Sequence, residues 1–206
     1  DVVARVPVIG GFGDPSIELL LNAKPTLILD TALADEAIGR KLGQMGLRRE
    51  RIACRTMDDI PTAILAIGGY LHHEQQARAV ADPLAAEIAR LRIASATATH
   101  PPRVFIEIWN DPLTTAGTNS YLSELIMLAG GRNIGDEVRK DYFQVSPEWV
   151  VSRDPEVILC FYMAGKTAAK DTVIARSGWH TVAAVRTGRV YDGFDNNLVL
   201  RQGPRV

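Results

Sequence analysis

Aromatic side chains gather at the ends of the predicted strands and in the loops nearby, where open α/β sheets bind their ligands. Trp109 closes one predicted strand, and Phe161 and Tyr162 close another. The full set is Phe12, Trp109, Tyr142, Phe143, Phe161, Tyr162 and Phe194. Aromatic walls suit a large ligand with few charges. The pattern therefore predicts a binding site, in which some of the rings only close the edge of the core.

A catalytic site is the alternative use of the same sheet edge. Glu107, Asp111 and Asp141 could act as carboxylates in a cleft enzyme. No nucleophile elbow, Ser/His/Asp pattern or zinc motif accompanies them, and acids at strand ends more often cap helices and form turns. The segment 72–74 (His-His-Glu) does not make a zinc helix, because adjacent helical residues point about 100° apart. We expect neither an enzyme nor a metal site.

The elements that carry these residues contain one stretch that the chain uses twice. Residues 18–29 read ELLLNAKPTLIL and residues 148–159 read EWVVSRDPEVIL. Each copy has a Glu that suits the first turn of a helix, a proline that ends the helix, and a short apolar run typical of a buried parallel strand. The copies lie too far apart for a short-period repeat protein, so they predict two similar lobes.

Composition limits the class of protein. The chain has 206 residues, is 47% hydrophobic and carries a formal charge of −1, which is ordinary for a globular protein and gives no reason to expect nucleic acid as a partner. No apolar run approaches the roughly 18 residues of a membrane span, and the first residues do not resemble a signal peptide. Cys54 and Cys160 fall in different lobes, and we expect two buried free thiols.

The remaining pattern predicts an α/β fold of two Rossmann-like lobes, with mostly parallel sheets, joined by a long connecting helix. Residues 1–57 form the first lobe, 58–99 the connecting helix and 100–206 the second lobe. The first lobe shows only about three strands, so we expect it to lack an opening strand–helix unit, whereas residues 201–205 look like a last helix cut short.

Element boundaries follow from periodicity and from Gly and Pro positions. Strands are predicted at 26–30, 51–56, 103–109, 156–161 and 189–191. Helices are predicted at 34–46, 58–97, 119–130 and 147–153, with a kink or break near Pro83. Loops are predicted at 113–118 and 141–147. Two lobes of this kind place a cleft between the carboxyl ends of their sheets.

Several of these segments resemble a known family. IEIWNDPLTTAGTNSYLSELIMLAGGRNI resembles the second-lobe signature of the substrate-binding proteins of ABC importers for vitamin B12, ferric siderophores and haem. GGFGDPSIELLLNAKPTLIL is similar to the first-lobe motif, and GWHTVAAVRTGRVYDG and LRQGPRV to the C-terminal pattern. The resemblance implies a periplasmic or lipid-anchored solute-binding protein with a rigid connecting helix. It also implies that Glu18 and Glu148 dock onto arginines of a permease dimer.

The ligand implied by this resemblance is a corrinoid or an iron chelate held between the lobes, and no other cofactor is expected. The segment from Trp109 and Asn110 to Gly117 looks most like that of corrinoid binders. Anionic ferric siderophores call for Arg or Lys, for which Lys166 and Arg201 are the candidates. Haem needs an axial ligand. The candidates for that role are Tyr142, Tyr162 and His180.

Overall fold

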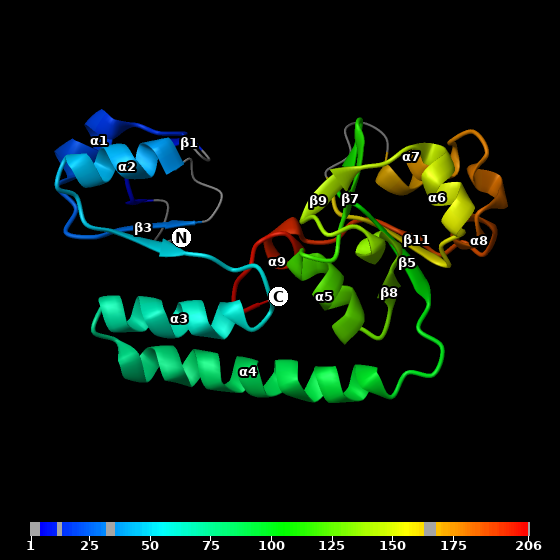
Figure 1. Cartoon of the computed structure of the whole chain (residues 1–206), viewed down its shortest axis with the longest axis horizontal. Helices are drawn as coiled ribbons and strands as arrows, with labels where there is room; N and C mark the ends of the chain where they lie inside the picture. The colour runs from blue at the N-terminus through cyan, green and yellow to red at the C-terminus, as the bar shows by residue number, and fades with distance from the viewer. Residues whose placement is uncertain (1–4, 12–13, 32–35, 163–167, 206) are drawn as a thin grey trace. The chain divides into compact units, whose positions relative to one another are not determined.

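A computed structural model describes residues 5–11, 14–31, 36–162 and 168–205, and the chain divides into two units, Asp1–Cys54 and Arg55–Val206 (Figure 1). Each unit combines helices with parallel strands, so the predicted α/β class is confirmed. The predicted connecting segment, 58–99, belongs to the same unit as the second lobe. Phe12 and Lys166, two of the residues singled out in the sequence, lie outside the described residues.

The first unit is built on a pair of parallel strands, β3 (Ile28–Thr31) and β4 (Arg49–Ile52), with Ile28 opposite Arg49. Helices α1 (Ile17–Ala23) and α2 (Glu36–Gln44) precede each strand, and β1 (Gly10–Gly11) pairs with β2 (Asp14–Pro15). The strand predicted at 51–56 begins earlier, at Arg49. Its charged start is accommodated because Arg49 donates from Nε to the Asp30 carboxylate at 2.6 Å.

The second unit has a four-stranded parallel sheet in the order β11-β10-β5-β8. These strands are β5 (Arg103–Glu107), β8 (Arg132–Asn133), β10 (Val157–Cys160) and β11 (Val190–Tyr191). The surrounding helices are α5 (Tyr121–Leu128), η2 (Ile134–Glu137), α6 (Pro147–Arg153), α7 (Ala169–Ile174), η3 (Trp179–Thr181), α8 (Ala183–Arg186) and α9 (Asn196–Val199). Phe105, Ile158 and Trp179 are fully buried in its core, with the Phe105 and Trp179 rings edge to face at 6.1 Å.

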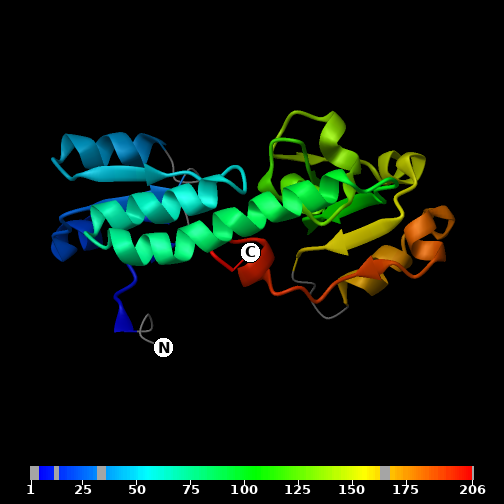
Figure 2. The same ribbon diagram turned by 90° about the horizontal axis from the view of Figure 1, so that it is seen from below.

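The predicted single connecting helix is wrong in one respect, because it is a hairpin of two antiparallel helices, α3 (Asp59–Tyr70) and α4 (Glu74–Ala96), that lie side by side (Figure 2). The chain turns at His72, which has a left-handed φ of 57°. Gly68 allows the close return of the chain, since a Cβ atom there would stand 2.2 Å from the Ala77 Cβ atom. The helix therefore breaks at residues 71–73 and not near Pro83.

Pro83 lies inside α4 without splitting it. A proline in a helix removes one backbone hydrogen bond, here to the carbonyl of Ala79. Pro83 and Ala79 are both exposed, so water can satisfy that carbonyl group. The exposed position explains why the proline does not end the helix.

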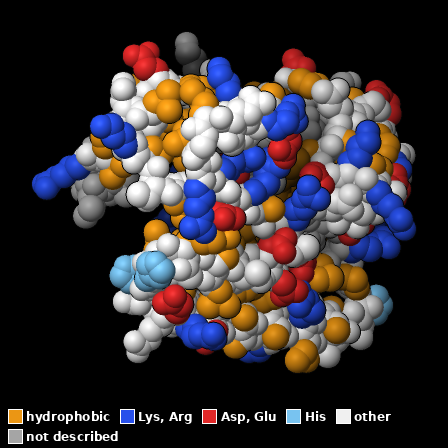
Figure 3. All heavy atoms as spheres, turned by 60° about the vertical axis from the view of Figure 1, so that its left-hand side comes forward, with side chains coloured by type: hydrophobic (Ala, Val, Ile, Leu, Met, Phe, Trp, Pro, Cys, Tyr) orange, Lys and Arg blue, Asp and Glu red, His pale blue; other side chains and the backbone are white. Residues whose placement is uncertain are grey.

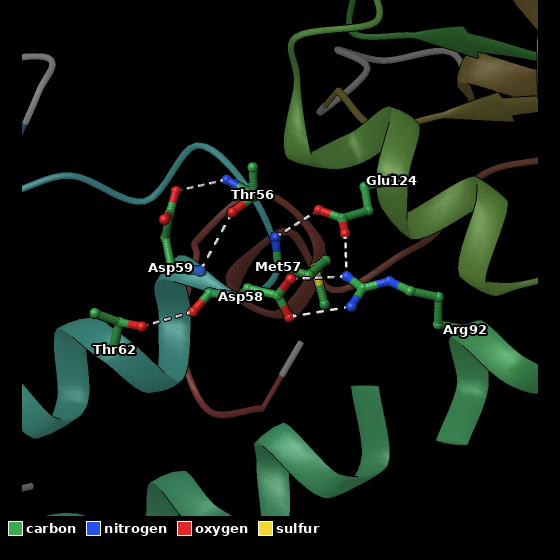
Figure 4. A network of polar contacts seen from close by, with 7 residues as sticks. All are labelled: Thr56, Met57, Asp58, Asp59, Thr62, Arg92 and Glu124. Carbon is green, nitrogen blue, oxygen red and sulfur yellow. Dashed lines mark hydrogen bonds and ion pairs between the residues drawn. The ribbon is translucent and has the colours of Figure 1, made fainter. Parts of the chain in front are cut away.

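A polar network fixes the start of α3 to α4 and α5 (Figure 4). Arg92 of α4 donates to Asp58 at 3.0 Å and to Glu124 of α5 at 2.6 Å. Glu124 also accepts a hydrogen bond of 2.7 Å from the backbone N–H of Met57, a buried residue. Asp59 accepts from the backbone of Thr56 at 2.8 Å. Through these contacts the second unit holds its helical hairpin at several points.

A three-stranded antiparallel sheet stands where loops were predicted. It consists of β6 (Trp109–Asn110), β7 (Leu113–Ala116) and β9 (Tyr142–Gln144), in the order β6-β7-β9. The predictions of loops at 113–118 and 141–147 are therefore wrong. Thr and aromatic residues favour strands, and this preference outweighed the Gly and Thr content that suggested loops.

The end of the described chain also differs from the prediction. Residues 201–205 form turns, and the last helix, α9, comes earlier. Asp195 caps α9 by accepting a hydrogen bond of 2.8 Å from the backbone N–H of Asn197. The Tyr121 hydroxyl of α5 donates to the Val199 carbonyl, which connects α9 to α5 within the second unit.

The burial of the cysteines and the distribution of surface charge can be compared with the expectations from composition. Cys160 is a buried free thiol, as predicted, whereas Cys54 is partly exposed, so its predicted burial is wrong. Lys and Arg side chains are interspersed with Asp and Glu on the face shown in Figure 3. Within the described ranges, no helix is both long and apolar enough to cross a membrane.

Candidate functional site

The parallel sheet of the second unit has a point where its strand order reverses. The chain runs from β5 to β8 on one side and then returns to place β10 on the other side of β5. Ligands of open α/β sheets bind beyond the carboxyl ends of the strands at such a switch point. Glu107, the last residue of β5, stands opposite Cys160, the last residue of β10. The residues that follow these two strands are the candidates for a site.

Two of the predicted ligand residues meet at this edge. Trp109 follows β5 and Tyr162 follows β10, and their rings lie edge to face with centroids 6.5 Å apart. Trp109 is 53% exposed, so much of its ring is free to contact another molecule. Its indole N–H is occupied, because Nε1 donates to the Asp111 carbonyl at 2.9 Å. The exposed ring therefore offers an apolar face in a fixed orientation.

The antiparallel sheet brings a second exposed aromatic residue to the same face as Trp109. Trp109 is paired with Thr114 and Thr114 with Gln144, while Tyr142 lies two residues from Gln144 on β9. Because side chains alternate between the two faces of a strand, Trp109, Gln144 and Tyr142 project from one face. Tyr142 is 43% exposed. The sequence did not single out Gln144; only the strand register identifies it.

Phe143, another predicted ligand residue, projects from the opposite face of this sheet. Its ring packs edge to face on Trp149 of α6 at 5.8 Å. The structure thus places it with the packing between β9 and α6. Its predicted role in binding has no further support from its position.

Phe161 and Phe194 form a third aromatic pair, with centroids 4.9 Å apart. Phe161 is buried, whereas Phe194, in the loop after β11, is 36% exposed. Of the two, Phe194 is the one that can contact a ligand, and the buried Phe161 ring packs against it.

An ion pair lies directly behind these aromatic residues. The fully buried Glu107 receives two hydrogen bonds of 2.6 Å from the guanidinium group of Arg176. Arg176 also donates to the side chain of Asn110, a predicted ligand residue, and lies over the Trp179 ring at 4.6 Å. Sequence reasoning considers Glu107 only as a possible carboxylate of a cleft enzyme and does not identify Arg176. No local spacing links these two residues, which are brought together by the fold.

The same pair affects the ionisable groups around it. Burial and the negative charge of Glu107 raise the pKa of the Tyr162 hydroxyl, so that phenol stays protonated. Burial, followed by the charges of Glu107 and Asp192, raises the pKa of the Cys160 thiol to about 12. Burial opposes the charge on Arg176, but the hydrogen bonds and charge of Glu107 outweigh it and the pKa of Arg176 is raised.

The remaining chemical candidates are dispersed. Glu107 is held by Arg176 and is not available as a general base, while Asp111 and Asp141 are exposed. Within the described part of the chain, no group of three or more His, Cys, Asp or Glu residues is placed to hold a metal ion. Of the candidates for an axial haem ligand, Tyr142 and Tyr162 lie at the strand-end edge and His180 lies in η3.

Arg201, a predicted positive residue of the site, lines a surface pocket with a volume of about 250 Å³. The other residues described around that pocket are Asp195, Asn197 and Gln202 to Arg205. None of the aromatic ligand candidates is among them. The pocket is therefore distinct from the sheet edge at which Trp109, Tyr142 and Tyr162 lie.

The two predicted docking residues have equivalent local structures. Glu18 lies in the first turn of α1 and Glu148 in the first turn of α6, and both are exposed. Hydrogen bonds from its own backbone N–H and from Ser146 lower the pKa of Glu148, which keeps the carboxylate charged. Both positions are accessible to a partner protein.

A family model described as periplasmic binding protein matches residues 1–196 of the chain. This chain belongs to the periplasmic binding protein family. The family is a class of binding proteins, and its prediction from the sequence motifs is confirmed. The carboxylates considered above as catalytic candidates, Glu107, Asp111 and Asp141, are therefore residues of a protein from a family of binding proteins.

Curated relatives and solved structures agree with this assignment. The vitamin B12-binding protein of Pectobacterium carotovorum subsp. carotovorum is 29% identical over 195 residues, covering 93% of this chain and 67% of that protein. The periplasmic vitamin B12-binding protein of Vibrio cholerae superposes with a TM-score of 0.73 at 25% identity, covering 93% of this chain and 73% of that one. The apo periplasmic haem-binding protein of Roseiflexus sp. RS-1 superposes with a TM-score of 0.83 at 25% identity, covering 98% of this chain and 79% of that one. The chain spans only about half, or less, of other curated relatives that it matches.

Proposed function

We propose that this protein captures a corrinoid and delivers it to an ABC permease. The observation that carries this proposal is the aromatic edge formed by the exposed rings of Trp109 and Tyr142 and the partly buried ring of Tyr162, with Trp109 and Tyr162 at the switch point of the parallel sheet. A corrin ring is large and flat, and such ligands bind against aromatic surfaces with few, well-placed polar groups. The relatives named as vitamin B12-binding proteins favour the same ligand class.

Asn110 and Gln144 supply polar groups beside these rings. Asn110 is exposed although its side-chain oxygen accepts from Arg176, and Gln144 shares the face of Trp109 and Tyr142. Uncharged amides can both donate and accept hydrogen bonds, which suits the amide side chains around a corrin ring. We expect the edge of the second unit to form one wall of the ligand site.

Haem is the second candidate, because the exposed Tyr142 could present a phenol to an iron atom and a structural relative is named as a haem-binding protein. A tyrosine ligates iron as the phenolate. Partial burial and the neighbouring Asp141 carboxylate raise the pKa of Tyr142, and that of Tyr162 is also raised. Both effects oppose the ionised form in the ligand-free protein, so haem binding would have to supply the energy of deprotonation.

Delivery to the permease would use Glu18 and Glu148, one exposed carboxylate from each unit. Exposed carboxylates steer association with basic partner residues and can be replaced without disturbing a core. This role places the protein in the periplasm, or on the extracellular face if a lipid anchor holds it.

Titration of the purified protein with cyanocobalamin, a ferric siderophore and haemin tests the ligand class. Tryptophan fluorescence is a direct signal, because Trp109 is exposed at the proposed site. We expect saturable quenching by cyanocobalamin. A clear response to haemin or to the siderophore, with none to cyanocobalamin, would exclude the corrinoid.

A further inference from the structure

The ion pair between Glu107 and Arg176 is unusual because one partner is completely buried at the end of a central strand. Glu107 has no exposed surface, and the Arg176 side chain is 15% exposed. Burying a carboxylate is unfavourable unless an opposite charge and hydrogen bonds compensate it. Arg176 provides both with its two hydrogen bonds of 2.6 Å. A hydrophobic pair of the same volume would stabilise a core as well or better, so stability alone does not explain the choice.

The position of the pair suggests a role in ligand selection. Arg176 donates to Asn110, and the charges of Glu107 and Arg176 both act on Tyr162. Asn110 and Tyr162 border the exposed ring of Trp109. The pair therefore lies immediately behind the surface proposed to contact the ligand.

An arginine in such a place would ordinarily attract anionic ligands. The planar guanidinium group binds carboxylates through two parallel hydrogen bonds. In this protein the two hydrogen bonds already go to Glu107, in the arrangement that a ligand carboxylate would adopt. Glu107 thus occupies the place of an anionic ligand group and cancels the positive charge.

We propose that the Glu107–Arg176 pair is a specificity-determining element that makes this edge select neutral ligands over carboxylate-bearing ligands of the same shape. This inference rests on the proposed function, because it concerns the ligand of the same site. It adds a prediction about charge to the prediction about ligand class. Glu107 and Arg176 are positioning residues here, acting through Asn110 and Tyr162.

Matched ligand pairs test the charge claim separately from the ligand class. Cyanocobalamin is compared with its monocarboxylic acid, in which one side-chain amide is hydrolysed, and haemin is compared with its dimethyl ester. The ratio of the two dissociation constants within a pair measures charge selection. Whether the corrinoid pair or the haemin pair binds at all shows the ligand class. A purely structural role of the ion pair would change stability without changing the ratio.

The variants isolate the charge of Glu107. Glu107→Gln removes the negative charge at nearly constant volume, and the double variant Glu107→Gln/Arg176→Gln removes both charges. Glu87→Gln is the matched control, because Glu87 also pairs with an arginine, Arg90, but on the exposed surface of α4. Circular dichroism checks that each variant is folded.

We expect the wild-type protein to bind the neutral member of the pair about tenfold more tightly or better, because a ligand carboxylate would lose its hydration at an edge where Glu107 already neutralises the arginine. Glu107→Gln should reduce this ratio about tenfold, while the Glu87→Gln control and the double variant keep a preference for the neutral ligand. An unchanged ratio in Glu107→Gln would overturn the proposal. If that variant does not fold, equal or tighter binding of the carboxylate by the wild-type protein would overturn it. Selection by charge within the haemin pair, without corrinoid binding, would support the role of the pair and refute the corrinoid.

Discussion

Glu18 and Glu148 occupy the same position in two helices of equal length, each two residues after a serine that caps its helix. The Ser16 hydroxyl accepts from the backbone of Leu19 at 3.3 Å, and that of Ser146 accepts from Trp149 at 3.2 Å. The helices end in the same way, at Lys24 and Asp154 in the left-handed conformation, each followed by proline. The repeated stretch in the sequence therefore folds into repeated local structure, with an exposed carboxylate at equivalent places.

Replacing both carboxylates tests their proposed docking role. We expect Glu18→Ala combined with Glu148→Ala to reduce transport about tenfold, since the variant loses both proposed charge pairs with the permease. Ligand affinity should not change. Uptake of labelled ligand by reconstituted permease measures the effect.

Glu74→Ala is the control for this experiment, because Glu74 is also an exposed first-turn residue, of α4. It should leave transport at the wild-type level. Undiminished transport in the double variant, at low and at high salt, would contradict the docking role.

Trp109 should be the main reporter of ligand binding. Of the three tryptophans, Trp179 is fully buried and Trp149 packs against Phe143, whereas Trp109 is half exposed at the proposed site. We expect Trp109→Phe to remove most of the fluorescence quenching on titration and Trp149→Phe to retain it. The reverse result would place the ligand at α6 and β9 instead.

The close return of the helical hairpin gives a prediction for stability. Gly68→Ala should destabilise the protein by about 1–3 kcal/mol, because the added methyl group meets Ala77 and the packing must shift. Gly69 is the natural control: a Cβ atom there has nothing within 4 Å. Gly69→Ala should be neutral or stabilising by about 0.5 kcal/mol, through helix propensity. Urea denaturation distinguishes the two, and equal midpoints would contradict this account of the turn.

Cys160 should be inert in the folded protein. A thiol with a pKa of about 12 is ionised in roughly one molecule in ten thousand at pH 8. We expect iodoacetamide to modify Cys160 only after unfolding, as measured by mass spectrometry of its peptide. Because its folded pKa lies above its ordinary value, this thiol contributes stability that is present below about pH 9 and declines as the pH rises toward 12. Equal labelling rates in native and unfolded protein would refute the burial.

Much of the fold followed from local signals in the sequence. The helix predicted at 147–153 begins and ends as expected, because Ser146 caps it and Pro155 follows it. The buried strands β5 and β10 were visible as short apolar runs between Gly and Pro positions. These features depend on neighbouring residues alone.

The predictions from sequence were wrong where contacts between separate segments of the chain determine the structure. The break at His72 depends on the packing of Gly68 against Ala77, which the helical periodicity of this segment does not reveal. The strands β7 and β9 depend on pairing between segments about 28 residues apart, such as Thr115 with Phe143. The candidate site shows the same limit, because the sequence identified Trp109 and Tyr162 but not the contact of Glu107 with Arg176.

Calorimetric titration of the wild-type protein and of Trp109→Ala with cyanocobalamin tests the central claim most directly. We predict one cyanocobalamin bound per wild-type chain and an affinity about tenfold lower in the variant, since losing the contact of one large aromatic side chain costs on the order of 1–2 kcal/mol. Saturation by haemin or a ferric siderophore at one per chain, with no heat from cyanocobalamin, would contradict the proposed function.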